Sequence, residues 1–149
     1  MTQKIEKKIF IEAQAAAVWK ALIKPDLIKR WMAEPEIGLQ VSVDWTEGSI
    51  ISMRGCHHIE FENRGIVLKV DPENELRYSY LSSLSQLPDH PDNYSIINFK
   101  LNQSGNDTEV VLTITNFPTE SIFRHVELYW QVTLVMLKQV IETSIVQRV

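Results

Sequence analysis

The side chains best suited to chemistry are the single cysteine and the two histidines that follow it, Cys56-His57-His58. Thiolate and imidazole groups bind metals and can also act as nucleophile and base. On a strand, however, Cys56 and His58 face one side and His57 faces the other, so the three do not converge easily. A structural zinc would also need four ligands, typically in paired spacing. The segment therefore predicts no metal site, and Cys56 is expected to be an ordinary buried or half-buried residue.

Two further histidines lie where solvent or a cavity entrance would surround them. His125 precedes Tyr129 by one helical turn, and it would either face solvent or act as a general base at a cavity mouth. His90 lies in the proline-rich stretch 88–92, which predicts a solvated loop, with a lid over a cavity as the alternative. The chain holds no nucleophile elbow, phosphate-binding glycine loop, dinucleotide fingerprint or metalloprotease motif. The sequence therefore assigns no catalytic residue, no metal ligand and no cofactor.

Length and composition limit the classes of protein to consider. The 149 residues, 44% hydrophobic and 23% charged, predict one globular domain over residues 1–149. A net charge of -4, with no Lys/Arg run longer than two residues, argues against a nucleic-acid partner. No apolar run approaches the ~20 residues of a membrane span, and the N-terminus does not resemble a signal peptide. We expect a soluble cytoplasmic protein.

Hydrophobic periodicity predicts the elements that must position these groups. Period two indicates a strand over residues 5–11, and helical period indicates a helix over residues 13–23, which Pro25 ends. A second short helix is predicted over residues 27–32. Near the C-terminus, Thr119 is a suitable N-cap, and the apolar spacing beyond it predicts a helix of about 27 residues.

Between these helices the pattern predicts six strands. Apolar residues alternate without a fault from residue 37 to residue 45, and Gly55 is expected to end the strand that follows. Asn-Arg-Gly at residues 63–65 predicts a bulge or bend, and Ser-Gly-Asn-Asp at residues 104–107 predicts a hairpin turn. The predicted strands cover residues 37–45, 49–54, 56–70, 76–80, 94–101 and 109–117.

The order of these elements predicts the α+β class. One strand, two short helices, six antiparallel strands and one long helix leave a sheet with one apolar face that needs a cover. The C-terminal helix is the only predicted element long enough to supply it, at roughly 40 Å for 1.5 Å per residue. The sheet is therefore expected to wrap around this helix.

Four short motifs follow one another between about residue 4 and residue 145. They are Val18-Trp19-Lys20-Ala21-Leu22 with Pro25, Ile28 and Trp31; Gly65-Ile66-Val67 with Val70-Asp71-Pro72 and Leu76; the run 108–114; and Trp130 with Leu134 and Leu137. Together they resemble the START-like superfamily, which includes the Bet v 1-like proteins, and its branch named after activators of the heat shock protein 90 ATPase. Glu73 and Asp107 stand where the branch usually has Pro and Gly, so the chain resembles a divergent member.

The resemblance implies a helix-grip fold, in which a curved antiparallel sheet of about seven strands wraps the long C-terminal helix and leaves a cavity between them. Strand alternation and helical period place eleven side chains toward that cavity, although each would equally serve as core. Tyr78 and Tyr80 are the strongest candidates, because a buried phenol needs a ligand, a main-chain group or water as hydrogen-bond partner. The candidate ligand-binding residues are Trp31, Trp45, Met53, Phe61, Tyr78, Tyr80, Ile97, Phe99, Trp130, Leu134 and Leu137.

We expect the cavity to bind a small hydrophobic or amphipathic, lipid-like ligand. One alternative is an enzyme of the cyclase, dehydratase or hydrolase kind, which needs convergent polar groups in the cavity. Another is a chaperone module that contacts heat shock protein 90, which needs an exposed partner surface. Fold alone does not choose between them. A homodimer is a further option, through a patch formed by outward-facing Val111 and Phe117.

Overall fold

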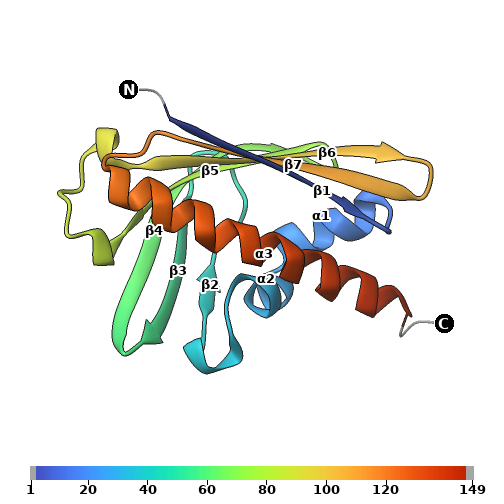
Figure 1. The fold of residues 1–149 in the computed structure, drawn as a ribbon, viewed down its shortest axis with the longest axis horizontal. Coiled ribbons are helices and arrows are strands. Elements are labelled where there is room, and N and C mark those ends of the chain that lie inside the picture. The colour runs from blue at the N-terminus through green and yellow to red at the C-terminus, as the bar shows by residue number, and fades with distance from the viewer. Residues whose placement is uncertain (1–2, 147–149) are drawn as a thin grey trace.

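The computed structural model describes residues 3–146, which form one open, curved antiparallel sheet and three α-helices (Figure 1). This architecture confirms the predicted α+β class and helix-grip fold. Short 3-10 turns cover Pro35–Ile37, Ser83–Ser85 and Pro91–Asn93. In chain order the elements are β1 (Lys4–Ile11), α1 (Ala15–Ile23), α2 (Pro25–Met32), β2 (Gln40–Ser42), β3 (Ile50–His57), β4 (Ile59–Asp71), β5 (Glu75–Ser82), β6 (Ser95–Ser104), β7 (Asp107–Thr115) and α3 (Glu120–Val146).

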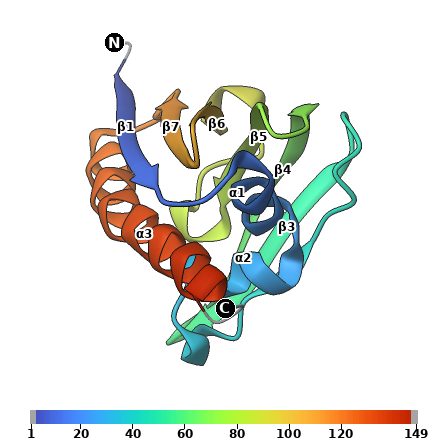
Figure 2. The same cartoon turned by 90° about the vertical axis from the view of Figure 1, so that its right-hand side faces the viewer.

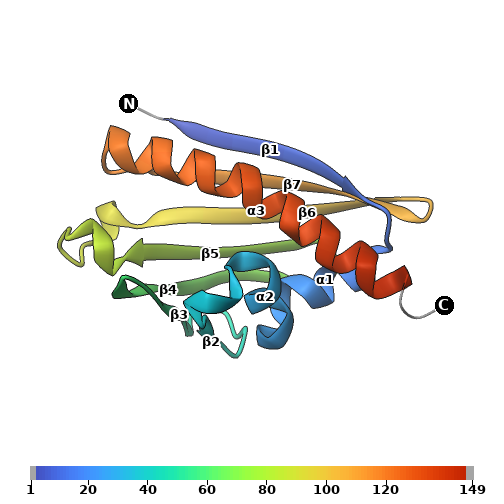
Figure 3. The same cartoon turned by 60° about the horizontal axis from the view of Figure 1, so that its bottom comes forward.

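The seven strands lie in the order β1-β7-β6-β5-β4-β3-β2. From β2 to β7 each strand pairs with the next one in the chain, and β1 returns to pair with β7 along its whole length, from Lys4↔Thr115 to Ile11↔Thr108. Viewed end-on in Figure 2, the sheet bends around the helices. Figure 3 shows α3 crossing the concave side of the sheet, with α1 and α2 beside it.

The long helix α3 begins as the sequence predicts. Thr119 Oγ1 accepts a hydrogen bond from the Ile122 N–H at 3.1 Å, which satisfies a donor that has no partner within the helix. None of the helices within residues 3–146 is long and apolar enough to cross a membrane. The inward face of α3 follows a spacing of three and four residues, with buried side chains at Val126, Trp130, Leu134, Leu137 and Ile141.

Pro25 separates the two short helices. It ends α1 because it lacks the N–H needed inside a helix, and it begins α2 because its fixed φ suits a first turn. The first helix begins at Ala15, two residues later than predicted. The buried indole of Trp31 donates its Nε1–H to Ala21 O at 2.9 Å. This hydrogen bond joins α2 to α1, so the pair packs as one unit.

The uninterrupted strand predicted over residues 37–45 is wrong. Only Gln40–Ser42 pairs with β3. Gly38 and Trp45 adopt left-handed backbone conformations, with φ of 62° and 58°, and these break the extended chain on either side. Trp45 turns its indole inward and donates a hydrogen bond to Ile23 O. The tertiary position of this large side chain therefore overrides the local strand pattern.

The strand end predicted at Gly55 is also wrong. Strand β3 continues through Gly55 to His57, and the turn into β4 falls at His58, whose φ is 66°. Histidine tolerates this left-handed region better than most residues with a side chain. Gly55 lies opposite Phe61, and a Cβ at Gly55 would come within 2.9 Å of the Phe61 ring. The absence of a side chain at Gly55 therefore leaves room for the Phe61 ring, and Gly55 does not form a turn.

An irregularity between β4 and β5 lies close to the bend predicted at residues 63–65. The register of the pair shifts between Val67 and Lys69. At Gly65 the two chains approach so closely that a Cβ would meet Ser79 O at 1.7 Å. The Ser79 hydroxyl accepts a hydrogen bond from the Ile66 N–H at 3.1 Å and so compensates for the interrupted ladder. Irregularities of this kind bend a strand and increase its twist.

Replacing Gly65 by Ala is expected to lower the free energy of unfolding by about 3 kcal/mol, because the new methyl group collides with main-chain atoms that cannot rotate away. Gly55→Ala is the matched control. Its methyl group meets only the side chains of Ile37 and Phe61, which can shift, so its loss should be about 1 kcal/mol. Urea unfolding followed by tryptophan fluorescence measures both values, and equal losses would contradict the close approach of β4 to β5.

Candidate functional site

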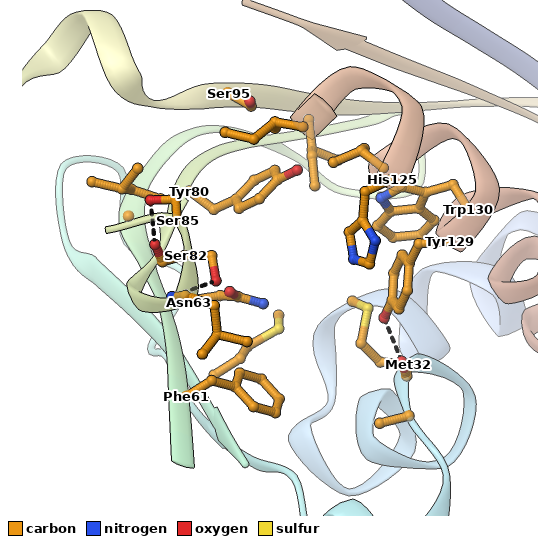
Figure 4. A pocket seen from close by; sticks show the side chains of 18 of the residues that line it. Met32, Phe61, Asn63, Tyr80, Ser82, Ser85, Ser95, His125, Tyr129 and Trp130 are labelled. Atoms are coloured by element: carbon orange, nitrogen blue, oxygen red, sulfur yellow. Dashed lines mark hydrogen bonds between the residues drawn. The ribbon is translucent and has the colours of Figure 1, made fainter. Parts of the chain in front are cut away.

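A cavity of about 640 Å3 lies between the N-terminal half of α3 and the concave face of strands β3 to β6 (Figure 4). Its apolar lining includes Met32, Ile51, Met53, Phe61, Ile97, Val126 and Trp130. The polar lining comes from the end of β5 and the turn after it, the beginnings of β4 and β6, and the first turns of α3. This polar set includes Asn63, Ser82, Ser85, Ser95, Ser121 and His125.

The cavity exists because only half of α3 packs tightly against the rest of the protein. Beyond Trp130 the inward residues are buried in the core, and Leu137 is fully enclosed. There Lys138 Nζ donates to Phe10 O at 2.7 Å and pairs with Glu142 at 2.6 Å, while Glu142 accepts from the Glu12 N–H. These contacts hold the C-terminal half of α3 to the end of β1. On the first turns of α3 the inward residues line the cavity instead: Ser121, Ile122, His125, Val126, Tyr129 and Trp130.

Three aromatic rings close the cavity on the core side. The Trp130 ring lies 5.8 Å from the Phe99 ring and 6.1 Å from the Trp31 ring, and the Trp31 and Phe99 rings are 6.5 Å apart, all measured between centroids. Tilted and edge-to-face contacts of this kind add to the stabilisation from burial. Of the three residues, Trp130 alone lines the cavity. The aromatic cluster therefore joins α2, β6 and α3 and forms a boundary of the site.

Tyr78 and Tyr80 extend from β5 into the cavity, where Figure 4 shows Tyr80 across from His125. Within residues 3–146 the Tyr78 hydroxyl has no hydrogen-bond partner, yet no fully enclosed side-chain oxygen in this part of the chain lacks one. The Tyr78 hydroxyl oxygen must therefore be accessible from the cavity, whereas the Tyr80 hydroxyl lies within hydrogen-bonding reach of the Ser95 side chain. Burial raises the pKa of Tyr78 far above its ordinary value and raises the pKa of Tyr80 to about 12. Both phenols stay protonated at neutral pH and can donate hydrogen bonds to a ligand.

Tyr129 approaches the cavity from α3 and is committed to a protein partner. Its hydroxyl donates a hydrogen bond to the main-chain oxygen of Met32, and this bond links α3 to the end of α2 (Figure 4). Removal of its phenol group from water raises the pKa of Tyr129 to about 12, although 38% of the residue's surface is exposed. Tyr129 therefore links α3 to α2 beside the cavity, whereas the Tyr78 hydroxyl has no partner among the described residues.

The eleven predicted ligand-binding residues divide into two groups. Six line the cavity: Met53, Phe61, Tyr78, Tyr80, Ile97 and Trp130. The other five, Trp31, Trp45, Phe99, Leu134 and Leu137, lie outside its lining and pack in or against the core. Contact of a ligand with any of the eleven stays a prediction.

Sequence reasoning missed most of the polar lining. Ser82 and Ser85 stand in a serine-rich stretch directly after a strand, a signal that could have drawn attention to them. Asn63 and Ser95 each stand near the beginning of a strand, where nothing in the sequence distinguishes them from solvated residues. Small hydroxyl side chains leave space beside the tyrosines and supply both donors and acceptors.

The histidines and the cysteine do not form an assembled catalytic group. His57 and His125 both line the cavity and are exposed at its mouth, His58 lies in the β3–β4 turn, and Cys56 is exposed rather than buried. Among the described residues no cluster of three or more potential ligands could hold a metal ion, and no hydrogen bond joins an imidazole to a cysteine, serine or tyrosine side chain. The arrangement can enclose an apolar group and donate hydrogen bonds to it.

Comparisons with known proteins agree with this architecture. The sequence profile described as "Activator of Hsp90 ATPase homolog 1-like protein" matches residues 12–142. A protein of Cytophaga hutchinsonii, solved in solution, is 33% identical, with a TM-score of 0.78 and 96% of each chain covered. The Aha1 dimer from Colwellia psychrerythraea is 23% identical, with a TM-score of 0.74 and 94% and 96% of the two chains covered. CalU16 from Micromonospora echinospora is 20% identical, with a TM-score of 0.73 and 98% and 80% covered. Among curated proteins none matches.

Raising the pH is expected to destabilise the protein above about pH 10. The pKa of Tyr80 and of Tyr129 is about 12 in the folded protein, whereas a tyrosine in an unfolded chain has a pKa of about 10. Between these values the unfolded chain has lost the phenolic proton that the folded protein retains, so the free energy of unfolding falls as the pH rises. Urea unfolding at a series of pH values measures this slope.

The variant Tyr80→Phe supplies the control for this slope. It removes one of the raised phenols, so the decline between about pH 10 and pH 12 should become shallower than in the original protein. A decline of the same steepness in both proteins would mean that Tyr80 ionises equally in the folded and unfolded states, contrary to its burial in the cavity.

Proposed function

Because the chain belongs to the family of activator of Hsp90 ATPase homolog 1-like proteins, we propose that it binds a small amphipathic molecule in the cavity between α3 and strands β3 to β6. The observation that carries the proposal is the combination of an apolar cavity with two phenol groups in its lining, of which Tyr78 has an accessible hydroxyl without a partner among the described residues. A volume of about 640 Å3 falls within the range of about 300–1,000 Å3 typical of small-molecule sites.

Apolar contact supplies the affinity in this proposal. The ligand's hydrophobic portion lies against Ile51, Met53, Phe61, Ile97 and Trp130. Each buried methylene group contributes roughly 0.8 kcal/mol, so an eight-carbon skeleton gains roughly 6 kcal/mol before the entropic cost of association. Tyr78 and Tyr80 set the orientation, because a ligand oxygen that reaches the unpartnered Tyr78 hydroxyl and the neighbouring Tyr80 hydroxyl can accept hydrogen bonds from them. The enzyme and chaperone-module alternatives stay predictions.

Native mass spectrometry of the freshly purified protein tests the proposal directly. A mass above that of the polypeptide, lost on denaturation, is expected and would supply the ligand's formula. The variant Val126→Trp places a large ring in the cavity from α3 and should reduce ligand occupancy by about tenfold or more, because the added ring takes the ligand's space.

Val132→Trp is the matched control for the cavity-filling variant. It makes the same change on the same helix at a position that is 65% exposed and outside the cavity lining, so occupancy should not change. The proposal fails if the native protein carries no extra mass and a panel of neutral and charged amphiphiles leaves its melting temperature unchanged.

We further propose that the protein self-associates through α3. Leu128, Val132 and Val135 are exposed apolar residues at helical spacing, so they form one stripe on the outer side of the helix. The patch expected from Val111 and Phe117 does not serve, since Val111 is half-buried and the Phe117 ring packs on Phe123. Support for a second copy as the partner comes from the Colwellia psychrerythraea relative, which was solved as a dimer.

The variant Val132→Lys is expected to convert a dimer into a monomer, because it places a charge at the centre of the stripe. Ile66→Lys is the control, since Ile66 is an exposed apolar residue on β4 and lies away from α3. Analytical ultracentrifugation over a range of concentrations measures the masses. A native protein that stays monomeric throughout, or a Val132→Lys variant that still forms the dimer, would contradict self-association through α3.

A further inference from the structure

The cavity is surrounded by many polar groups but by almost no charge. Of the described residues that line it, only Glu34, which is exposed at the rim, carries a formal charge at neutral pH, and no lysine or arginine contributes to the lining. His57 and His125 are the remaining titratable nitrogen groups, and both are exposed at the mouth. An anion that entered the cavity would meet no lysine or arginine among the described lining residues.

Several arginines stand next to cavity residues in sequence, and none of them belongs to the lining. Arg64 is exposed and alternates along β4 with Asn63 and Gly65, so its side chain extends from the opposite face of the strand. Arg54 pairs with Glu62 at 3.3 Å on the β3–β4 hairpin, next to the cavity residues Met53 and Phe61. Arg124 is next to His125 in the chain but pairs with Glu120 at 3.2 Å on the exposed side of α3. Each of these two guanidinium groups already has a carboxylate partner, which makes its recruitment by a ligand less favourable.

The first turn of α3 also borders the cavity, through Ser121 and Ile122. The N-terminus of a helix normally attracts an anion, since its first N–H groups have no partner within the helix. Here the Thr119 hydroxyl already accepts from the Ile122 N–H, and the carboxylate of Glu120 occupies the first turn. The positive end of α3 is therefore compensated by the protein's own oxygens.

The groups that remain suit an uncharged oxygen. Tyr78 and Tyr80 offer hydroxyl donors, and Ser82, Ser85 and Asn63 add short side chains that both donate and accept. A hydroxyl, carbonyl or amide group satisfies such partners without losing the hydration of a full charge. Burying an ionised carboxylate costs much more and needs a partner charge to compensate.

We propose that the cavity selects an uncharged amphipathic ligand, an apolar skeleton that carries a hydroxyl, carbonyl or amide oxygen, over an anionic ligand of the same shape such as a fatty-acid carboxylate. The inference rests on the proposed function and specifies the chemical class of its ligand. The oxygen of the ligand lies toward Tyr78 and Tyr80, and the skeleton lies toward Met53, Ile97 and Trp130.

Two fluorescent probes that share one aromatic skeleton test this selection: neutral N-phenylnaphthylamine and the anionic anilinonaphthalene sulfonate. Both titrations are made in the same buffer at the same pH. Only the fluorescence that is lost in the Val126→Trp variant is counted, so probe bound outside the cavity does not contribute to the measured affinity. We expect the neutral probe to bind about tenfold more tightly or better. Equal affinity, or tighter binding of the sulfonate, would overturn the selection.

A charge added at the mouth supplies the second arm of the test. Ser121→Lys, at an exposed lining position, should tighten the sulfonate about fivefold or more relative to the neutral probe. Gln131→Lys adds the same charge to α3 outside the lining and should change neither affinity. A sulfonate affinity that does not respond to Ser121→Lys would overturn the inference. Binding of neither probe would overturn the proposed function itself, so the two failures are distinguishable.

Discussion

The aromatic contact between Trp130, Phe99 and Trp31 is the constraint on which the rest of the architecture depends. It brings α3, β6 and α2 together at one place, and the Trp31 indole extends the connection to α1 through Ala21 O. A straight helix of 27 residues cannot follow a curved sheet over its whole length. Since α3 is fixed at Trp130 by this cluster and beyond it by Lys138 and Glu142, the turns before Trp130 border the cavity.

The space created in this way has a physical cost. Protein interiors are normally packed as densely as organic crystals, and a cavity of about 640 Å3 forgoes many favourable contacts. Several residues of the lining are too small to fill this space, among them Gly65, Ser82 and Ser95. Close approach of β4 to β5 requires the glycine, and that approach accompanies the bend of the sheet. A ligand that filled the cavity would restore contacts and stabilise the folded state by mass action.

The hydroxyl groups around the cavity differ in whether they already have a hydrogen-bond partner within the protein. Tyr129 and Thr119 use their hydroxyls within the protein, to link two helices and to cap α3, whereas the Tyr78 hydroxyl stays accessible from the cavity. The charged groups nearby neutralise one another at the surface, as Arg124 does with Glu120. What remains is an apolar interior with oriented neutral donors. Such a site discriminates through hydrogen-bond geometry and desolvation more than through attraction over distance.

The sequence by itself determined the element order, the α+β class, the cap at Thr119 and the hairpin turn at Gly105, because these depend on periodicity and local chemistry. Tertiary structure alone decided which inward residues line the cavity. Phe61 lines the cavity, whereas Phe99 packs against Trp31 and Trp130 in the core, and strand alternation alone does not distinguish the two. Tertiary packing also decided the left-handed backbone at Trp45, because the hydrogen bond of its indole to Ile23 O holds the side chain inward against the local strand pattern.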